Sequence, residues 1–226
     1  KDKRYRQRID YIANELAACQ KASGSGLVCA FPKGPALVAA HLRGEPITGV
    51  PWYTLHKVYA GLRDSVQLAD SEPSRGVLFR LADWGVVATK PLSDEQFEKM
   101  LETEYGGMNE IYADLYFMTG NEDYRRVAER FSQKAIMNPL AQGRDYLDGM
   151  HANTQIPKII GFQRVFEATG DDKYHNAAAF FWRTVAHTRA FATGGHGDAE
   201  HFFAMADFDK HVFSAKGSET CCQHNM

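Results

Sequence analysis

The chain has 226 residues, of which 44% are hydrophobic, and it carries 26 Lys and Arg residues against 28 Asp and Glu residues. A net charge of -2 leaves no basic excess for a phosphate backbone or an anionic membrane, so neither nucleic acid nor membrane partners are expected. No apolar run approaches the roughly 18 residues that span a bilayer. The composition therefore predicts a soluble globular chain with a sizeable core.

Four cysteines are too few for a disulfide scaffold, and two of them, Cys221 and Cys222, are adjacent. Cys19 and Cys29 flank a Ser-Gly loop, and the sequence leaves open whether they form a disulfide. Because the sequence starts at Lys1, it also leaves open whether a signal peptide precedes it. Compartment and oligomeric state are not determined at this level.

Apolar residues recur at helical spacing along nearly the whole chain, and strand-like alternation is almost absent. Tyr5, Ile9, Ile12 and Leu16 predict a first amphipathic helix with these side chains on one face. Residues 27–50 contain three prolines and several glycines, which predicts a long extended loop.

Further helices follow that loop in the prediction. One begins with Thr54 as its cap, and Ser93 opens a capping box for a shorter helix. Pro157 is expected in the first turn of a later helix, where its missing N–H costs little. The predicted ranges are 54–70, 77–89, 93–102, 109–119, 122–136, 155–169 and 172–189.

A repeat organises these helices. Residues 115–124 (LYFMTGNEDY) and 165–174 (VFEATGDDKY) share an aromatic residue, Thr-Gly, an acidic pair and a final Tyr, at a shift of 50 residues. Each copy ends one helix at a glycine and caps the next, which makes the repeating unit a helical hairpin. Arrays of this kind form open solenoids or closed rings, and a ring of six hairpins needs about 300 residues, whereas this chain spans about four hairpins.

Segments rich in Gly, His, Trp and Asn precede alternate helices and predict one concave polar site. His56 and His151 can hydrogen-bond a hydroxyl-rich ligand, and Trp52 or Tyr53 can stack on the apolar face of a sugar. For each histidine taken singly, a helix-end side chain satisfied by backbone groups is the alternative. The segments are residues 51–56, 105–109, 148–155 and 193–200.

Glu200 lies between His196, His201 and two phenylalanines in a glycine-rich stretch. A carboxyl group partly removed from water by aromatic rings is a candidate proton donor, and an exposed loop glutamate is the alternative. Residues 219–224 (ETCCQH) offer carboxylate, thiol and imidazole groups, all of which zinc accepts. A buried unreactive cysteine is the alternative there.

Together these motifs resemble the zinc-dependent β-L-arabinofuranosidases of glycoside hydrolase families 127 and 146. The resemblance covers essentially the whole chain, and several separate motifs in the same order make it specific. It rests on VPWYTLHK at 50–57, GGMNE at 106–110, HANTQIPK at 151–158, TGG at 193–195 with Glu200, and SETC at 218–221.

The resemblance implies an all-α fold, an (α/α)6 barrel that is present only in part. Residues 1–226 would then be the N-terminal portion of the catalytic domain, without the remainder of the barrel and the β-sandwich domains of full-length members. It also implies a retaining glycosidase that removes terminal L-arabinofuranosyl groups from an arabinose-containing oligosaccharide or glycan. The implied nucleophile is a cysteine thiolate on Zn2+, which one glutamate and three cysteines hold.

Residue by residue, the resemblance implies that Glu200 is the acid/base and that Glu219 and Cys221 are zinc ligands. His56 and His151 match histidines that contact the sugar, and Trp52 lies in the motif beside the first of them.

The sequence departs from the family in its cysteines. The other two cysteine ligands, one of them the nucleophile, form a later Cys-Cys pair in the family, and Cys222 is not that pair because it adjoins Cys221. Residues 1–226 alone are therefore expected to show little or no hydrolysis. Met108 replaces a sugar-contacting histidine of some relatives, which leaves the exact substrate open.

Two other functions stay open as alternatives. One is a lyase or epimerase on a helical toroid, which needs no thiolate cluster. The other is a non-catalytic carbohydrate-binding or helical-repeat module.

Overall fold

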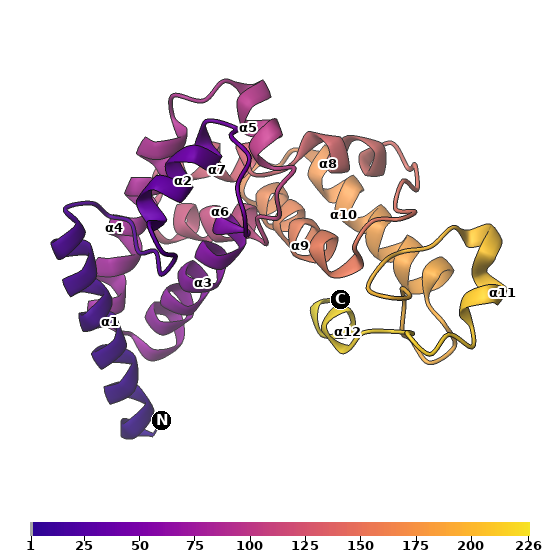
Figure 1. Ribbon diagram of the computed structural model, residues 1–226, viewed down its shortest axis with the longest axis horizontal. Coiled ribbons are helices and arrows are strands. Elements are labelled where there is room, and N and C mark those ends of the chain that lie inside the picture. Colours follow the sequence, from indigo (N-terminus) through magenta and orange to yellow (C-terminus); the bar gives the residue numbers. More distant parts are fainter. Residues whose placement is uncertain (1) are drawn as a thin grey trace. The chain divides into compact units, whose positions relative to one another are not determined.

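The structure is a computed structural model that describes residues 2–226 (Figure 1). These residues form helices and loops, and within that range β-pairing is limited to isolated bridges. The all-α class predicted from the periodicity is therefore confirmed. No helix of the described range is both long enough and apolar enough to cross a bilayer. The chain divides into two compact units, one ending at Arg130 and the other comprising Phe131–Met226.

The first unit is built from two helical hairpins with further helices packed on them. In the first hairpin α3 packs on α4, in the second α6 packs on α7, and α3 also contacts α6. The N-terminal helix α1 lies against α4, as Figure 1 shows. The elements are α1 (Lys3–Ser23), α2 (Gly34–Leu42), α3 (Pro51–Ala69), α4 (Glu72–Thr89), α5 (Asp94–Met100), α6 (Met108–Thr119) and α7 (Glu122–Arg130).

Two buried tyrosines fix how the hairpins of the first unit pack. The hydroxyl of Tyr59 in α3 donates to the Leu81 carbonyl at 2.7 Å, and the Tyr112 hydroxyl in α6 donates to the Ala82 carbonyl at 3.1 Å. Both hydroxyls lie over Gly85 of α4, which has no side chain to exclude them. The core thus holds polar groups that are satisfied by the α4 backbone.

The second unit is centred on α10, which packs against both α8 and α9, and α12 packs against α9. Arg189 is buried in this unit, where its guanidinium binds the Asp145 carboxylate at 2.8 Å and the Asp148 carboxylate at 2.5 Å. The elements are α8 (Lys134–Ala141), α9 (Ala152–Thr169), α10 (Asp172–Thr184), a π-helical turn (Val185–Arg189), a 3-10 turn (Met205–Asp207), α11 (Phe208–His211) and α12 (Thr220–Asn225).

The repeat predicted from the sequence is confirmed in backbone detail. Gly120 after α6 and Gly170 after α9 have the same left-handed conformation, with φ 71° and ψ 9° at both. Thr119 and Thr169 each donate a side-chain hydrogen bond to the carbonyl four residues earlier, at 2.7 and 2.8 Å. The two turns are therefore copies in hydrogen bonding as well as in sequence.

A third hairpin turn keeps the same period. Asp70 ends α3 in the left-handed conformation with φ 52°, and Ser71 caps α4 by accepting from the backbone N–H of Ser74. Asp70 stands 50 residues before Gly120. The sequence comparison missed this copy because Asp replaces Gly and because Ser74 replaces the final Tyr.

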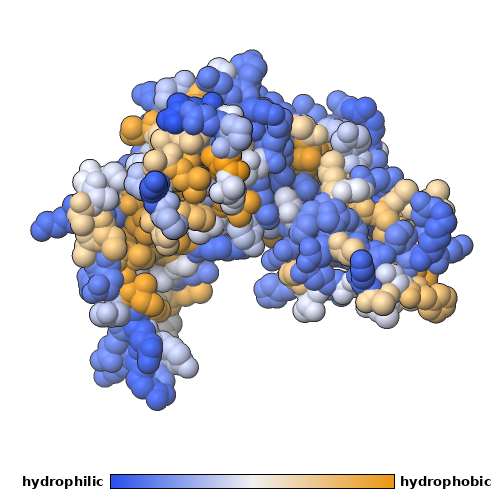
Figure 2. Space-filling model, in the orientation of Figure 1, coloured by the Kyte–Doolittle hydropathy of each residue, from blue (hydrophilic) through white to orange (hydrophobic). Residues whose placement is uncertain are grey.

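The buried face of α1 differs from the prediction. Tyr5 and Ile12 are 69% and 56% exposed, whereas Ala13 and Gln20 are buried. Gln20 takes the inward position because its amide donates to the carbonyls of Gly26 and Val77. Here the side-chain hydrogen bonds of Gln20, rather than hydrophobicity, decide which face of α1 is buried. Apolar surface therefore remains exposed on the first unit, seen in orange in Figure 2.

Residues 27–50 are not one extended loop, which corrects the prediction. They contain α2, whose Pro35 lies in the first turn, where a proline costs no hydrogen bond. Ala and Leu residues, which favour helix formation, follow Pro35 in α2. Cys29, in the loop before α2, and Cys19 are both free thiols, so the disulfide that the sequence left open is not formed.

Several helix boundaries also differ from the prediction. Pro51 rather than Thr54 opens α3, and the predicted helix 122–136 breaks after Arg130, so that α7 and α8 are separate. Pro157 lies inside α9 rather than in its first turn, because that helix begins at Ala152. The capping box at Ser93 is confirmed, with both of its hydrogen bonds present.

Candidate functional site

His56, on α3, is one of the histidines predicted to contact a sugar. Its imidazole lies against the glycine pair of the second motif, so closely that a Cβ on Gly106 would come within 2.5 Å of Nδ1. Gly106 also has a φ of 61°, which favours glycine. The structure thus brings motifs 50–57 and 106–110 together, and it is the glycines that make room for the ring.

A partly buried charge network stands beside His56. Arg63 on α3 contacts the Glu110 carboxylate at 2.9 Å and the Asp114 carboxylate at 2.6 Å, both on α6. A Cβ on Gly107 would lie 3.0 Å from His56 Nε2 and 3.3 Å from Glu110 Oε2, which places that carboxylate next to the ring. Sequence reasoning did not single out Arg63 or Asp114. The available signal was two carboxylates four residues apart on one helix.

Burial, and next the positive charges of Lys57 and Arg63, together lower the pKa of His56 from 6.5 to about 3. The folded protein therefore keeps this imidazole neutral, while the unfolded chain binds a proton below about pH 6.5. Stability that depends on His56 is present above that pH and is lost as the pH falls from about 6.5 towards 3.

When the pH falls from about 7 to about 5, the unfolding free energy of the wild type should decrease. We expect this decrease to be about 2 kcal/mol smaller in the His56→Gln variant, which has no imidazole at this position. Urea unfolding at the two pH values measures this difference. His187→Gln, which removes an exposed imidazole, is the control. Parallel losses in His56→Gln and the wild type would contradict the prediction.

Trp52 does not lie where a sugar could stack on it. Its side chain is fully buried, its indole N–H donates to the Met100 sulfur at 3.1 Å, and its ring packs against Trp84 at 5.9 Å. In this structure the Trp52 ring belongs to the core of the first unit and presents no exposed face on which a sugar could stack. Tyr53, the other residue named for this role, is half-buried.

Glu200 lies at the tip of a tight backbone turn in the second unit. Asp198 and His201 exchange two backbone hydrogen bonds, of 2.9 and 3.0 Å. The two residues between them, Ala199 and Glu200, have φ values of 47° and 68°. Two consecutive residues with positive φ form a type I′ turn, which strongly prefers Asn and Gly. Residues with side chains cost about 1–3 kcal/mol each in such sparsely populated regions, and this strain is typical of functional sites.

The Glu200 turn is paired with the segment that contains His151. The Ala152 N–H donates to the Glu200 carbonyl at 2.8 Å, and the Phe202 N–H donates to the Met150 carbonyl at 2.9 Å. These bonds flank His151, and its ring meets that of His201 edge-on at 5.2 Å. Motifs 151–158 and 193–200 therefore share one place in the second unit.

His151 contacts the Glu200 carboxylate directly, with 3.4 Å between Nε2 and Oε2. The other ring nitrogen, Nδ1, accepts a hydrogen bond from the Thr154 N–H at 3.2 Å, so that His151 caps α9. An accepting Nδ1 places the proton of the neutral ring on Nε2. The helix cap thus leaves the protonated ring nitrogen on the side of the candidate acid/base.

The aromatic shielding expected for Glu200 is absent in this unit. Its side chain is 57% exposed. Phe202 is buried against Phe181 and His196, and Phe203 stacks on His211 at 4.0 Å. Both phenylalanines turn towards other rings, so that the strained turn and the His151 contact, rather than desolvation, distinguish this carboxylate.

The predicted zinc ligands lie at the start of α12. Glu219 precedes this helix, and its carboxylate accepts from the Cys221 thiol, which raises the pKa of that thiol. The Cys222 sulfur lies 3.8 Å from Glu219 Oε2 and is buried. Burial, and next the Glu219 charge, raise the pKa of Cys222 to about 12.

These groups fit zinc only in part. A carboxylate beside two thiols is a donor set that zinc accepts. A bound cation would offset the repulsion between the Glu219 carboxylate and the thiolates, which otherwise helps to keep the thiols protonated. Structural zinc sites have four ligands. Among residues 2–226, however, no three His, Cys, Asp or Glu side chains are grouped so that they could hold a metal.

The loop 193–195 lies against the segment that carries Glu219. A Cβ on Gly195 would collide with the Ser218 side chain, and Gln223 donates to the Gly194 carbonyl at 2.6 Å. Asn225 on α12 donates to the Asn153 side chain on α9 at 2.7 Å. The loop 193–195 and the N-terminal end of α9 therefore both contact the segment 218–225.

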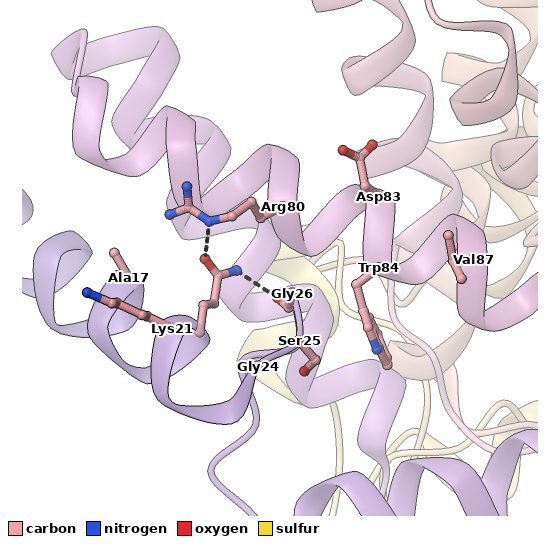
Figure 3. Close-up of a pocket in the computed structure, with 10 residues that line it drawn as sticks. Ala17, Lys21, Gly24, Ser25, Gly26, Arg80, Asp83, Trp84 and Val87 are labelled. Atoms are coloured by element: carbon pink, nitrogen blue, oxygen red, sulfur yellow. Dashed lines mark hydrogen bonds between the residues drawn. The ribbon is translucent and has the colours of Figure 1, made fainter.

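A cavity of about 840 Å³ lies elsewhere, between α1 and α4 of the first unit (Figure 3). Arg80 donates to the Gln20 side chain at 2.9 Å, and Gln20 donates to the Gly26 carbonyl, which braces one wall. None of the predicted site residues lines this cavity. It is therefore not the predicted site.

Comparison with known proteins gives a match over the whole chain. The family model for the catalytic domain of beta-L-arabinofuranosidase, GH127, covers residues 1–226. A search of curated proteins finds no match to this chain.

Proposed function

Since the chain belongs to the beta-L-arabinofuranosidase GH127 catalytic-domain family and is thus a glycoside hydrolase domain, we propose that it releases terminal L-arabinofuranose with retention. The substrate class is an arabinose-containing oligosaccharide or glycan. The observation that carries this proposal is the pairing of Glu200 with His151 on a strained turn. The family match favours a hydrolase over the lyase, epimerase and binding-module alternatives.

Glu200 is the acid/base in this proposal. Its exposed carboxyl group can reach a glycosidic oxygen, protonate it as the bond breaks, and later take a proton from water. His151 Nε2 lies 3.4 Å from the same carboxylate, where the imidazole can orient the Glu200 side chain. The Thr154 N–H keeps that ring in place by occupying Nδ1.

The sugar contacts in this proposal come from His56 and His151. The buried, neutral His56 ring can donate or accept a hydrogen bond, and its Nδ1 has no hydrogen-bond partner among the described atoms. A buried nitrogen without a partner is costly unless a ligand or water satisfies it. Tyr53 takes over the stacking role that the buried Trp52 cannot perform.

Zinc is proposed on the basis of the family resemblance. Glu219 and Cys221 would supply two of the four ligands, and bound zinc keeps a ligand thiol deprotonated near neutral pH. The four cysteines of residues 1–226 are Cys19, Cys29, Cys221 and Cys222. They do not include the later Cys-Cys pair of the family, which would supply the nucleophile. The set of zinc ligands is therefore incomplete within residues 1–226. We therefore propose little or no turnover by residues 1–226 alone.

The test is the release of p-nitrophenol from p-nitrophenyl β-L-arabinofuranoside by the intact protein, with zinc content measured on the same sample. We expect release with β-arabinose as the first-formed anomer, together with bound zinc, and no release from residues 1–226 alone. The α-L-arabinofuranoside is the control substrate. An intact, zinc-loaded protein that leaves the β-substrate untouched would contradict the activity, and turnover by residues 1–226 would contradict the missing nucleophile.

A further inference from the structure

We propose that Asp198 is a positioning residue for Glu200, an inference that rests on the proposed function. The sequence did not single out Asp198. In the structure it begins the turn that carries Glu200, and its side chain ties that turn to residues 211–216.

The Glu200 turn requires outside support. Ala199 and Glu200 both adopt positive φ values, which residues with a Cβ rarely adopt, so the turn is not held by local preference. On one side, backbone hydrogen bonds to residues 150–152 hold it. On the other side, the Ala199 N–H donates to the Lys216 carbonyl at 2.9 Å.

The Asp198 carboxylate holds residues 214–216, which support the second side of the turn, in place. One oxygen accepts from the Ser214 hydroxyl at 2.8 Å, and the other accepts from His211 Nδ1 at 2.6 Å. The Ser214 hydroxyl oxygen in turn accepts from the Lys216 N–H at 3.1 Å. Asp198, Ser214, Lys216 and Ala199 thus form a closed loop of hydrogen bonds around the base of the turn.

The surroundings of Asp198 suit a rigid support. Its side chain is 13% exposed, and the hydrogen bonds from His211 and then Ser214 lower its pKa, so it is ionised at neutral pH. The His211 ring stacks on Phe203 at 4.0 Å, which fixes the donor. Charge-assisted hydrogen bonds of this length are among the stronger ones.

The role of Asp198 is indirect, because both of its carboxylate oxygens are already occupied by protein donors. Its removal would free the Ala199–Glu200 tip to leave the strained conformation. Glu200 would then lose its alignment with His151 and with the glycosidic oxygen. Proton transfer should suffer, whereas bond cleavage that needs no proton should not.

The test uses Asp198→Ala in the intact protein and two β-L-arabinofuranosides. One has an alkyl leaving group, which must be protonated, and the other has a 2,4-dinitrophenyl group, which departs without a proton. We expect kcat/KM to fall about tenfold or more for the alkyl substrate and less than about twofold for the dinitrophenyl substrate. Asp207→Ala is the matched control, because Asp207 pairs with Lys210 and does not bind the turn.

Equal losses on both substrates, or no loss on either, would overturn the positioning role. A wild type that cleaves neither substrate would instead contradict the proposed function. Hydrogen exchange of residues 196–203 gives a readout independent of turnover. Faster exchange in Asp198→Ala than in Asp207→Ala supports the proposal, and equal exchange overturns it.

Discussion

Replacing Glu200 by Gln should lower kcat/KM by about 10²–10⁴-fold for a β-L-arabinofuranoside whose leaving group needs a proton. The amide keeps the shape of the side chain but can neither give a proton to the departing oxygen nor take one from water. The contact with His151 Nε2 stays available to the amide oxygen, so the change removes chemistry more than structure. Steady-state kinetics on the alkyl arabinofuranoside measure the effect.

Glu167→Gln is the matched control for this prediction. Glu167 lies on α9 of the same unit and pairs with Arg164 on the surface, away from the Glu200 turn. We expect its kcat/KM to stay within about twofold of the wild type, since surface substitutions have small effects. If Glu200→Gln retained wild-type kcat/KM on the alkyl substrate, the acid/base assignment would be wrong.

The second large effect is expected on stability. In Gly85→Ala, the new methyl group would collide with the Tyr112 hydroxyl and come within 3.0 Å of the Tyr59 hydroxyl. Both hydroxyls would have to leave the α4 carbonyls to which they donate. Overpacking of this kind, with buried hydrogen bonds disturbed, should cost about 3 kcal/mol or more of unfolding free energy.

Gly61→Ala is the matched control in the same unit. Gly61 is exposed in the interior of α3, and a Cβ there would meet no atom within 4 Å. We expect this variant to gain about 0.5–1 kcal/mol, because Ala loses less backbone entropy than Gly in a helix. Chemical denaturation of both variants measures the difference, and a neutral or stabilised Gly85→Ala would show that the tyrosines are not packed as described.

The regular parts of the fold could be predicted because their causes are local. Gly120 and Gly170 end helices through a left-handed conformation that glycine adopts without strain, and Ser93 opens a capping box with Gln96. Each of these signals lies within a few consecutive residues. The third hairpin turn at Asp70 escaped notice because Asp adopts the left-handed conformation less readily than Gly and is therefore a weaker signal for the end of a helix.

Predictions that depended on burial were less successful. Trp52 and Tyr53 are neighbours with similar chemistry, yet only Trp52 is fully buried, against Trp84 of α4. Gln20 faces inward on α1 while Tyr5 faces solvent. Hydrophobicity indicates which residues can be buried, but the partner on another helix decides which of them are.

By itself, the sequence determined the helical class, the hairpin period and the motifs that identify the glycosidase family. These features depend on spacing and on single residues with strong backbone preferences. The tertiary structure alone decided that His151 Nε2 lies within 3.4 Å of the Glu200 carboxylate, that Glu200 lies on a strained turn, and that Asp198 braces that turn through Ser214 and His211. These contacts join residues up to 49 positions apart, from 151 to 200, and no local pattern encodes which side chains will meet across such a distance.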